Sequence, residues 1–215
     1  TSMMWKATEK GLAEFNFVNL REFGLGPHKS VDDTPYGGGD GMLLRCEPVF
    51  NAIESVKAKD PDAKVILPTP VGEIWNQKMA REFAGTSENS HYIILCPHYE
   101  GYDERILSIV DYKISLGKYV LTGGELPACI LIDSVARLCE GVLSDKECYE
   151  NESVSCGMLE YPQYTRPPVF LEREVPPILL SGHHENIDKW RKEQSIALTK
   201  ERRPDLYAAY EVAQK

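Results

Sequence analysis

The stretch KVILPTPVGEIWNQKMAREFAGTSENSHYIILC, residues 64–96, decides the fold class. It opens on KVIL (64–67), a short apolar run, and closes on HYIILC (91–96), a second run of the same kind. Both runs have the length and composition of buried strands, and residues 73–84 between them suit a helix. Two strands joined by a helix predict a parallel pair, because a parallel crossover needs a long connection of this kind.

The alternation of strands and helices continues on both sides of this stretch. Upstream, residues 48–59 carry apolar side chains at helical spacing behind a proline placed to open the helix. Residues 14–20 (EFNFVNL) indicate a short strand. Downstream, residues 118–121 (KYVL) indicate another strand and residues 125–139 a helix. We therefore expect an α/β fold with a mainly parallel sheet.

The character of the sequence changes after Leu143. Residues 144–160 contain five acidic residues, few apolar ones and no periodicity, which predicts a mobile linker. Prolines mark the segment that follows, and residues 186–214 indicate two or three helices. The predicted organisation is a ligand-binding domain at 1–143, a linker at 144–160 and a small helical domain at 161–215.

The composition is that of an ordinary globular protein, with 42% hydrophobic and 27% charged residues. No apolar run approaches the roughly 18 residues of a membrane span, and the first residues lack a signal peptide's apolar core. Six cysteines without metal-ligand spacing are typical of a reducing compartment. We expect a cytoplasmic protein with no membrane partner and no metal site of this type.

The net charge of −9 argues by itself against a nucleic-acid partner, because phosphate binding requires Lys and Arg. The charge is uneven, however. Residues 161–215 contain nine Lys and Arg against eight Asp and Glu, so the acidic excess lies upstream. A basic patch in the C-terminal part would serve RNA binding, whereas a solvated helix face is the alternative.

Three loops that each follow an apolar run could hold a ligand. They are residues 69–72 (TPVG), 97–101 (PHYEG) and 116–124 (LGKYVLTGG). In open α/β sheets ligands bind beyond the carboxyl ends of strands, and glycine lets the backbone approach a ligand closely. Ordinary turns are the alternative for each loop. The glycine signatures of dinucleotide-binding and P-loop proteins are absent.

A glycine-rich segment, VDDTPYGGGDGM, spans residues 31–42. Four glycines in five positions cannot form a packed strand or a stable helix. The flanking Asp-Asp and Pro-Tyr argue against a plain tether, so we interpret this segment as a loop that passes close to a bound molecule.

Several motifs in order resemble one family, the tRNA (guanine-N1-)-methyltransferases. The segment 31–42 resembles the family's VDDxPYGGGxGM, residues 99–105 (YEGYDER) its YEGxDER, and residues 116–128 (LGKYVLTGGELPA) its IGDYVLSGGELPA. DSVAR (133–137) and YTRP (164–167) follow in the same order, as do VPPILLSG (175–182) and Trp190-Arg191. The resemblance covers nearly all 215 residues.

The resemblance implies a fold, a reaction and partners. The fold is of the SPOUT type, an α/β sheet whose C-terminal part threads into a trefoil knot, followed by a helical tRNA-binding domain. The family transfers a methyl group from S-adenosylmethionine to N1 of the guanosine 3′ of the tRNA anticodon, position 37. Its members are homodimers with the active site at the subunit interface, and Mg²⁺ is possible as a cofactor.

The resemblance also assigns roles to residues. The donor would be bound by Thr69, Pro70, Gly72, Pro97, Tyr99, Glu100, Gly101, Leu116, Gly117, Lys118, Tyr119, Val120, Leu121, Gly123, Gly124 and Pro127. The tRNA would contact Asp32, Tyr36, Gly41, Met42, Arg166, Lys189 and Arg191. No cluster of residues locates a metal ion.

The reaction itself needs a base at guanine N1 and a positive charge near O6, where negative charge develops. By resemblance these are Glu152 and Arg137. Without the resemblance, Arg137 reads as a helix salt-bridge partner of Asp133 and Glu152 as a solvated charge. Glu150 and Asp145 lie in the same linker and are further candidates for the base.

Three features depart from the family pattern. The family begins with an apolar strand that has no counterpart here, so we expect the first strand of the sheet to be missing. Where the family has Gly-Arg before Tyr-Glu-Gly, this chain has Pro97-His98. The Asp in the family's linker aligns with Glu152 of this chain. Two other functions therefore stay open: a SPOUT methyltransferase on another RNA, and a non-catalytic RNA-binding relic.

Overall fold

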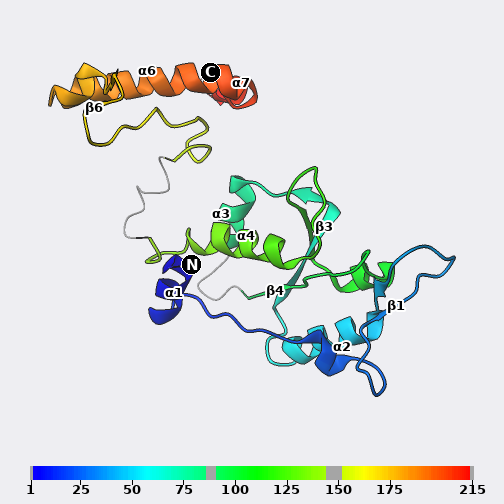
Figure 1. The fold of residues 1–215 in the computed structure, drawn as a ribbon. Coiled ribbons are helices and arrows are strands. Elements are labelled where there is room, and N and C mark those ends of the chain that lie inside the picture. The colour runs from blue at the N-terminus through cyan, green and yellow to red at the C-terminus, as the bar shows by residue number, and fades with distance from the viewer. Residues whose placement is uncertain (1, 86–90, 144–151, 214–215) are drawn as a thin grey trace. The chain divides into compact units, whose positions relative to one another are not determined.

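The structure is a computed structural model that describes residues 2–85, 91–143 and 152–213. The chain divides into two compact units, Thr1–Leu143 and Ser144–Lys215, which are described separately (Figure 1). The first unit contains the helices α1 (Ser2–Glu9), α2 (Cys46–Lys57), α3 (Gln77–Gly85) and α4 (Glu125–Ala136), and the short 3-10 helices η1 (Leu20–Phe23) and η2 (Glu104–Ile109).

The centre of the first unit is a three-stranded parallel sheet. Its order is β4 (Tyr92–Ile94), β3 (Lys64–Ile74) and β5 (Tyr112–Ser115). The parallel pair predicted from residues 64–67 and 91–96 is confirmed, with Val65 opposite Ile93. Because β3 is the central strand, both of its faces need apolar cover.

Helices supply this cover on both faces of the sheet. Val65 and Leu67 pack on one side with Val49 and Ile53 of α2. On the other side Ile66 joins a second cluster that includes Met79, Phe83, Ile114 and Leu131, contributed by α3, β5 and α4. Figure 1 shows α2 and the pair α3 and α4 on opposite sides of the strands. The alternation along KVIL therefore sets the two layers of the core.

Strand β3 contains an excursion of four residues. Pro68 and Glu73 both pair with Ile114 of β5, so residues 69–72 leave the ladder and return to it. The expected loop 69–72 is thus a bulge inside one strand. The helix expected from residue 73 begins only at Gln77, because Glu73 and Ile74 continue the pairing with β5.

Two strand predictions are wrong. Residues 14–19 form no strand and Leu20 begins η1, and the side chain of Phe17 is 96% exposed. Residues 118–121 lie in a loop, and the third strand of the sheet is Tyr112–Ser115. The true strand contains polar residues that hid it, whereas Val120 in the apolar run is 89% exposed. A strand needs a neighbouring strand for its backbone hydrogen bonds, and an apolar run in the sequence does not show that one is present.

Two further pairings complete the first unit. Strands β1 (Asp32–Asp33) and β2 (Leu43–Leu44) form a short antiparallel pair at the base of the glycine-rich loop. Helix α1 lies at the C-terminal end of α4, where Ala7 is fully buried and Lys10 Nζ donates to the carbonyl of Gly141 at 3.0 Å.

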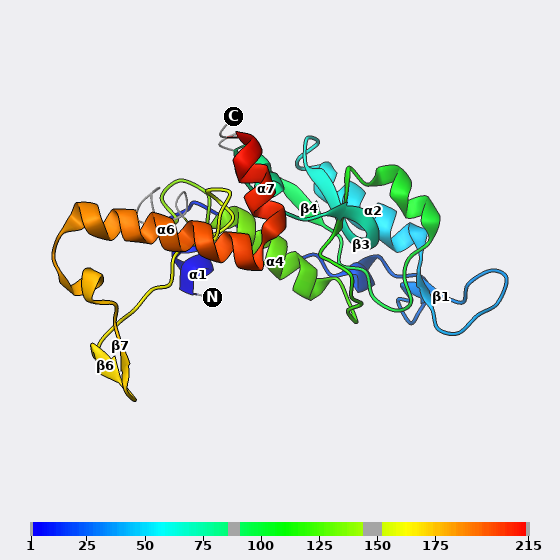
Figure 2. The same cartoon turned by 90° about the horizontal axis from the view of Figure 1, so that it is seen from above.

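The second unit is helical with one hairpin (Figure 2). Strands β6 (Val169–Phe170) and β7 (Arg173–Glu174) precede the 3-10 helix η3 (Pro177–Leu180), and α6 (His184–Arg202) and α7 (Pro204–Ala213) follow. Two or three helices were expected in residues 186–214, and the structure has two among the described residues, α6 and α7.

The second half of the expected linker is packed rather than free. Thr199 of α6 accepts a hydrogen bond from the Leu159 backbone at 2.9 Å, and Ser195 donates to the Leu159 carbonyl. Ser153 accepts from the Glu160 backbone at 2.9 Å. Hydrogen bonds to a helix thus hold a segment whose low apolar content predicted mobility. Residues 144–151 of the expected linker lie outside the described residues.

Candidate functional site

The three candidate loops follow strands of one parallel sheet. The bulge 69–72 interrupts β3, residues 97–101 follow β4, and residues 116–123 follow β5. Because parallel strands point the same way, their carboxyl ends meet at one edge, where α/β proteins bind ligands. The sheet therefore brings together three segments that are far apart in the sequence.

Glycines allow these loops to pack closely. The Gly124 backbone donates to the Pro97 carbonyl at 2.8 Å, and a Cβ at Gly124 would lie 2.5 Å from Pro97 Cδ. A Cβ at Gly72 would lie 2.4 Å from the Ile114 nitrogen of β5. Both distances are shorter than any normal contact, so these positions require glycine. The loops depend on each other for their shape.

The loop after β5 offers free backbone groups. Within the part of the chain that the structure describes, residues 118–123 make no hydrogen bond. Tyr119, Val120 and Leu121 are exposed. Just before them, the buried Ser115 hydroxyl lies 3.4 Å from the Gly117 nitrogen, and Gly117 has φ +150°, a conformation that other residues rarely adopt. Unpaired N–H and C=O groups beside strand ends are suited to hold a small polar ligand.

The glycine-rich segment is attached to the loop after β4. The Glu100 backbone donates to the Met42 carbonyl at 3.1 Å, and Leu44 donates to the Gly101 carbonyl at 2.9 Å. Gly41 lies against the Glu100 side chain, where a Cβ would come within 2.2 Å of Cγ. Two motifs separated by about sixty residues thus form one structure.

Side chains strengthen this attachment. Partial burial, and then a hydrogen bond to the Asp32 carboxylate, raise the pKa of the Tyr99 hydroxyl. Tyr99 has φ +65°, which is uncommon for a bulky residue and is a sign of a constrained loop. The rest of the segment extends away: Tyr36 is fully exposed, and Figure 1 shows the loop between β1 and β2 projecting from the unit.

Four residues that support the loops received no role from the sequence: Cys46, Tyr102, Asp103 and Arg105. Thr69 is buried with its hydroxyl 3.0 Å from that of Tyr102. Asp103 accepts from Arg105 Nε at 2.9 Å and from Nη2 at 2.8 Å, and this guanidinium holds the pKa of the Asp103 carboxyl well below its usual range. Burial, and then a hydrogen bond to Asp103, raise the pKa of the Cys46 thiol to about 11. Tyr102, Asp103 and Arg105 belong to the quoted YEGYDER, which was the available signal.

Pro97 and His98, which stand where the family has Gly-Arg, both contact the start of α4. The Pro97 carbonyl is used by Gly124, and His98 Nδ1 lies 3.3 Å from Glu125 Oε1 at the start of α4. His98 also lies close to Gly123, where a Cβ would be 2.8 Å from Nδ1. Pro127, expected to contact the donor, is buried in the first turn of α4.

The two expected catalytic residues belong to different units. Arg137 is half-buried at the C-terminal end of α4, and its backbone donates to the Asp133 carbonyl at 3.2 Å. Glu152 is half-buried in the second unit, and its carbonyl accepts from Cys156 at 3.3 Å. Asp145 and Glu150 lie outside the described residues.

The expected tRNA-binding residues of the second unit differ in their surroundings. Arg166 and Lys189 are exposed. Arg191 is half-buried, stacks over the Tyr161 ring at 4.9 Å and pairs with Asp188 at 3.4 Å. Its packing against Tyr161 gives Arg191 a structural role as well.

Three further features of the described residues concern metal ions, cavities and membranes. No group of three His, Cys, Asp or Glu side chains suited to a metal is found within residues 2–85, 91–143 and 152–213. Cavities of about 350 and 460 Å³ lie along α2, away from the three loops, with Phe50 and Glu54 lining both. None of the described helices is long and apolar enough to cross a bilayer.

The architecture is that of an α/β protein with glycine loops gathered at the carboxyl edge of a parallel sheet, joined to a helical second unit. Comparison with known proteins specifies the family. The chain belongs to the tRNA (guanine-1)-methyltransferase TrmD family, whose model matches residues 1–209. The resemblance stated from the motifs is confirmed.

Curated relatives agree along the whole chain. A tRNA (guanine-N(1)-)-methyltransferase of Clostridium botulinum (strain Kyoto / Type A2) is 48% identical over 214 residues, which are 100% of this chain and 88% of the relative. Those of Ruminiclostridium cellulolyticum and Halalkalibacterium halodurans are 49% and 51% identical over 208 residues, 96% of this chain and 88% and 83% of the relatives.

Proposed function

We propose that this chain transfers a methyl group from S-adenosylmethionine to N1 of the guanosine at tRNA position 37, immediately 3′ of the anticodon. The observation that carries the proposal is the family match over residues 1–209, which includes the three loops, Arg137 and Glu152. A cytoplasmic location is part of this proposal, because tRNA is the substrate.

The donor would lie against the three loops. The free backbone groups of residues 118–123 fit the adenine and ribose, and Glu100 is exposed nearby for a cationic group. When bound, the donor supplies an electrophilic methyl group. The protein's own part is to hold the donor at the sheet edge, and Gly72, Gly117 and Gly124 give the loops the shape for it.

The guanine requires two further actions. Its N1 carries a proton at neutral pH, so a base must remove it, and negative charge then develops on O6. Glu152 is proposed to take the N1 proton. Arg137 is proposed to place its guanidinium at O6, because this group keeps its charge at every physiological pH.

We also propose a homodimer with a trefoil-knotted catalytic part. Helix α4 supports the dimer, because it is apolar on more than one side: Ala128 and Leu131 are buried while Leu126 and Ile130 are exposed. A helix that is apolar all round normally has cover on every face. Mg²⁺ has no fitting ligand cluster among the described residues, so no step is assigned to it.

Two alternatives are separated by experiment. A relic without catalysis would not bind the donor, so titration calorimetry with S-adenosylmethionine distinguishes it from an enzyme. An enzyme for another RNA would bind the donor but leave tRNA unmethylated. Transfer of a labelled methyl group to a tRNA transcript, with a transcript carrying adenosine at position 37 as control, tests the proposal: label in both transcripts, or in neither, would refute it.

A further inference from the structure

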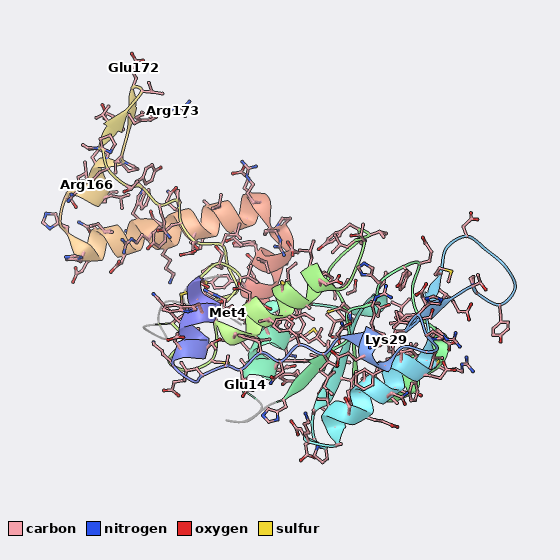
Figure 3. The ribbon with its side chains drawn as sticks, turned by 60° about the horizontal axis from the view of Figure 1, so that its bottom comes forward. Met4, Glu14, Lys29, Arg166, Glu172 and Arg173 are labelled. Atoms are coloured by element: carbon pink, nitrogen blue, oxygen red, sulfur yellow. The ribbon has the colours of Figure 1, made fainter. Side chains whose placement is uncertain are left out.

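The hairpin of the second unit exposes an aromatic and aliphatic edge. Strands β6 and β7 pair Val169 with Glu174 and Phe170 with Arg173. The side chain of Phe170 is 63% exposed and that of Leu171 is 77% exposed. Figure 3 shows the hairpin projecting from the unit, with Glu172 and Arg173 toward its tip and Arg166 nearer its base. Large apolar side chains on a protruding element suit recognition better than packing.

The turn of the hairpin is built from unusual residues. Leu171 and Glu172 have φ +47° and +61°, and a turn with two successive positive φ values normally uses Asn and Gly. Bulky residues are rarely held in this conformation, and such positions concentrate at ligand clamps. Because the turn is exposed, burial does not explain the choice of residues.

Two arginines beside this edge have no carboxylate partner among the described residues. Arg166 and Arg173 form no ion pair with a described residue. In the same unit, Arg191, Arg202 and Arg203 pair with Asp188, Glu201 and Asp205. In a protein with net charge −9, two unpaired guanidinium groups on a projecting hairpin are suited to a polyanion.

We propose that the hairpin 166–175 is an RNA-contact element in which Phe170 stacks on an unpaired nucleobase of the tRNA while Arg173 and Arg166 bind the adjacent phosphates. This proposal rests on the proposed function, and it specifies a contact for the second unit. Aromatic stacking on unpaired bases next to basic side chains is a general mode of RNA recognition. The hairpin's mixture of charges and apolar groups fits this mode better than an interface between copies, whose core is depleted of charge.

Variants that separate ring, size and charge test the proposal. Phe170→Leu keeps an apolar side chain but removes the ring, and it should weaken binding of a tRNA transcript roughly 5- to 150-fold, the effect of losing one stacked base. Phe170→Tyr keeps the ring and should bind as the parent does. Arg173→Gln should reduce the slope of log affinity against log salt by about 0.7–0.9, the value for one phosphate contact. Fluorescence anisotropy at several salt concentrations measures all three.

Controls make each outcome decisive. Val212→Leu, an exposed substitution on α7, should leave tRNA affinity unchanged, and donor affinity should be parental in every variant. Parental tRNA binding by Phe170→Leu would overturn the proposal while leaving the methyltransferase assignment intact. Loss of the dimer in that variant on sedimentation would also overturn it, since the hairpin would then be an interface between copies. A parent protein that bound no tRNA would refute the proposed function itself.

Discussion

Arg137 ends helix α4 in the first unit, and its proposed role is electrostatic. Arg137→Ala should reduce single-turnover methylation by about 10²–10³, the usual cost of losing one preorganised charge partner. The affinity for the methyl donor, measured by calorimetry, should stay parental, because Arg137 is proposed to contact the guanine and not the donor. Arg137→Lys keeps the charge but not the planar fork, so an intermediate rate is expected. An alanine variant with a parental rate, or one that loses donor binding, would contradict the role.

Glu152 is proposed as the base, and two substitutions examine it. Glu152→Gln keeps the shape but removes basicity, so the rate of methylation should fall by about 10²–10⁴. Glu152→Asp restores the family's residue and should retain activity, or raise it where the longer side chain reaches less well. Rapid-quench methylation under single-turnover conditions compares them with the parent. A near-parental Gln variant would transfer the base role to another carboxylate, with Glu150 next.

The roles given to single residues stay predictions, whereas the contacts between them can be compared with the sequence. The order of motifs singled out Arg137 and the glycines of the loops. The Asp32–Tyr99 and Thr69–Tyr102 pairs were not predictable, because each joins segments that only the folded sheet brings together. Spacing in the sequence contains no information on such pairs.

At the scale of elements, the bulge 69–72 is held against β5 by the absence of a side chain at Gly72. Gly72→Ala should lower the free energy of unfolding by about 1–3 kcal/mol, because the added methyl group would overlap backbone atoms that cannot move aside. It should also weaken donor binding. Urea denaturation and calorimetry measure the two effects.

Gly85 provides the matched control for this substitution. It ends α3, and nothing lies within 4 Å of a Cβ built there. Gly85→Ala should therefore leave donor affinity unchanged and stability equal or higher by up to about 1 kcal/mol. Equal destabilisation by both substitutions would mean that close packing at Gly72 is not what shapes the bulge.

Helices and strands could be predicted where the apolar spacing in the sequence matches a buried face in the structure. Residues 64–67 lie in β3 and residues 48–57 in α2, because their apolar spacing matches a face that is buried; the predicted helix 48–59 therefore ends two residues early. Residues 14–20 and 118–121 were mistaken for strands because an apolar run resembles a strand whether or not a partner strand is adjacent. The strand Tyr112–Ser115 escaped notice because its first two residues are exposed and polar in character.

At the scale of the whole molecule, the proposed dimer makes a distinct prediction. Ile130→Glu places a charge on the exposed apolar side of α4, and it should convert a sedimenting dimer at micromolar concentration into monomers with no methylation activity. Val212→Glu on α7, also exposed, should leave the dimer intact. A parent that is a fully active monomer would refute the dimer.

The division of the chain into two units could be predicted from the sequence only in part. The two compact units meet at Leu143, the residue after which the composition of the sequence changes. Ser195 donates a hydrogen bond to the Leu159 carbonyl and Thr199 accepts one from the Leu159 backbone, so this end of the expected linker is held on α6, which no composition rule predicts.

The loops, Arg137 and Glu152 are proposed to act together in methylating one atom of one tRNA base. Mass-spectrometric analysis of nucleosides from a tRNA transcript incubated with the protein and S-adenosylmethionine tests it most directly. We expect N1-methylguanosine approaching one per tRNA with guanosine at position 37, and none when that position is adenosine. A methyl group on another atom or at another position, or no methylated nucleoside from a protein that binds both donor and tRNA, would contradict it.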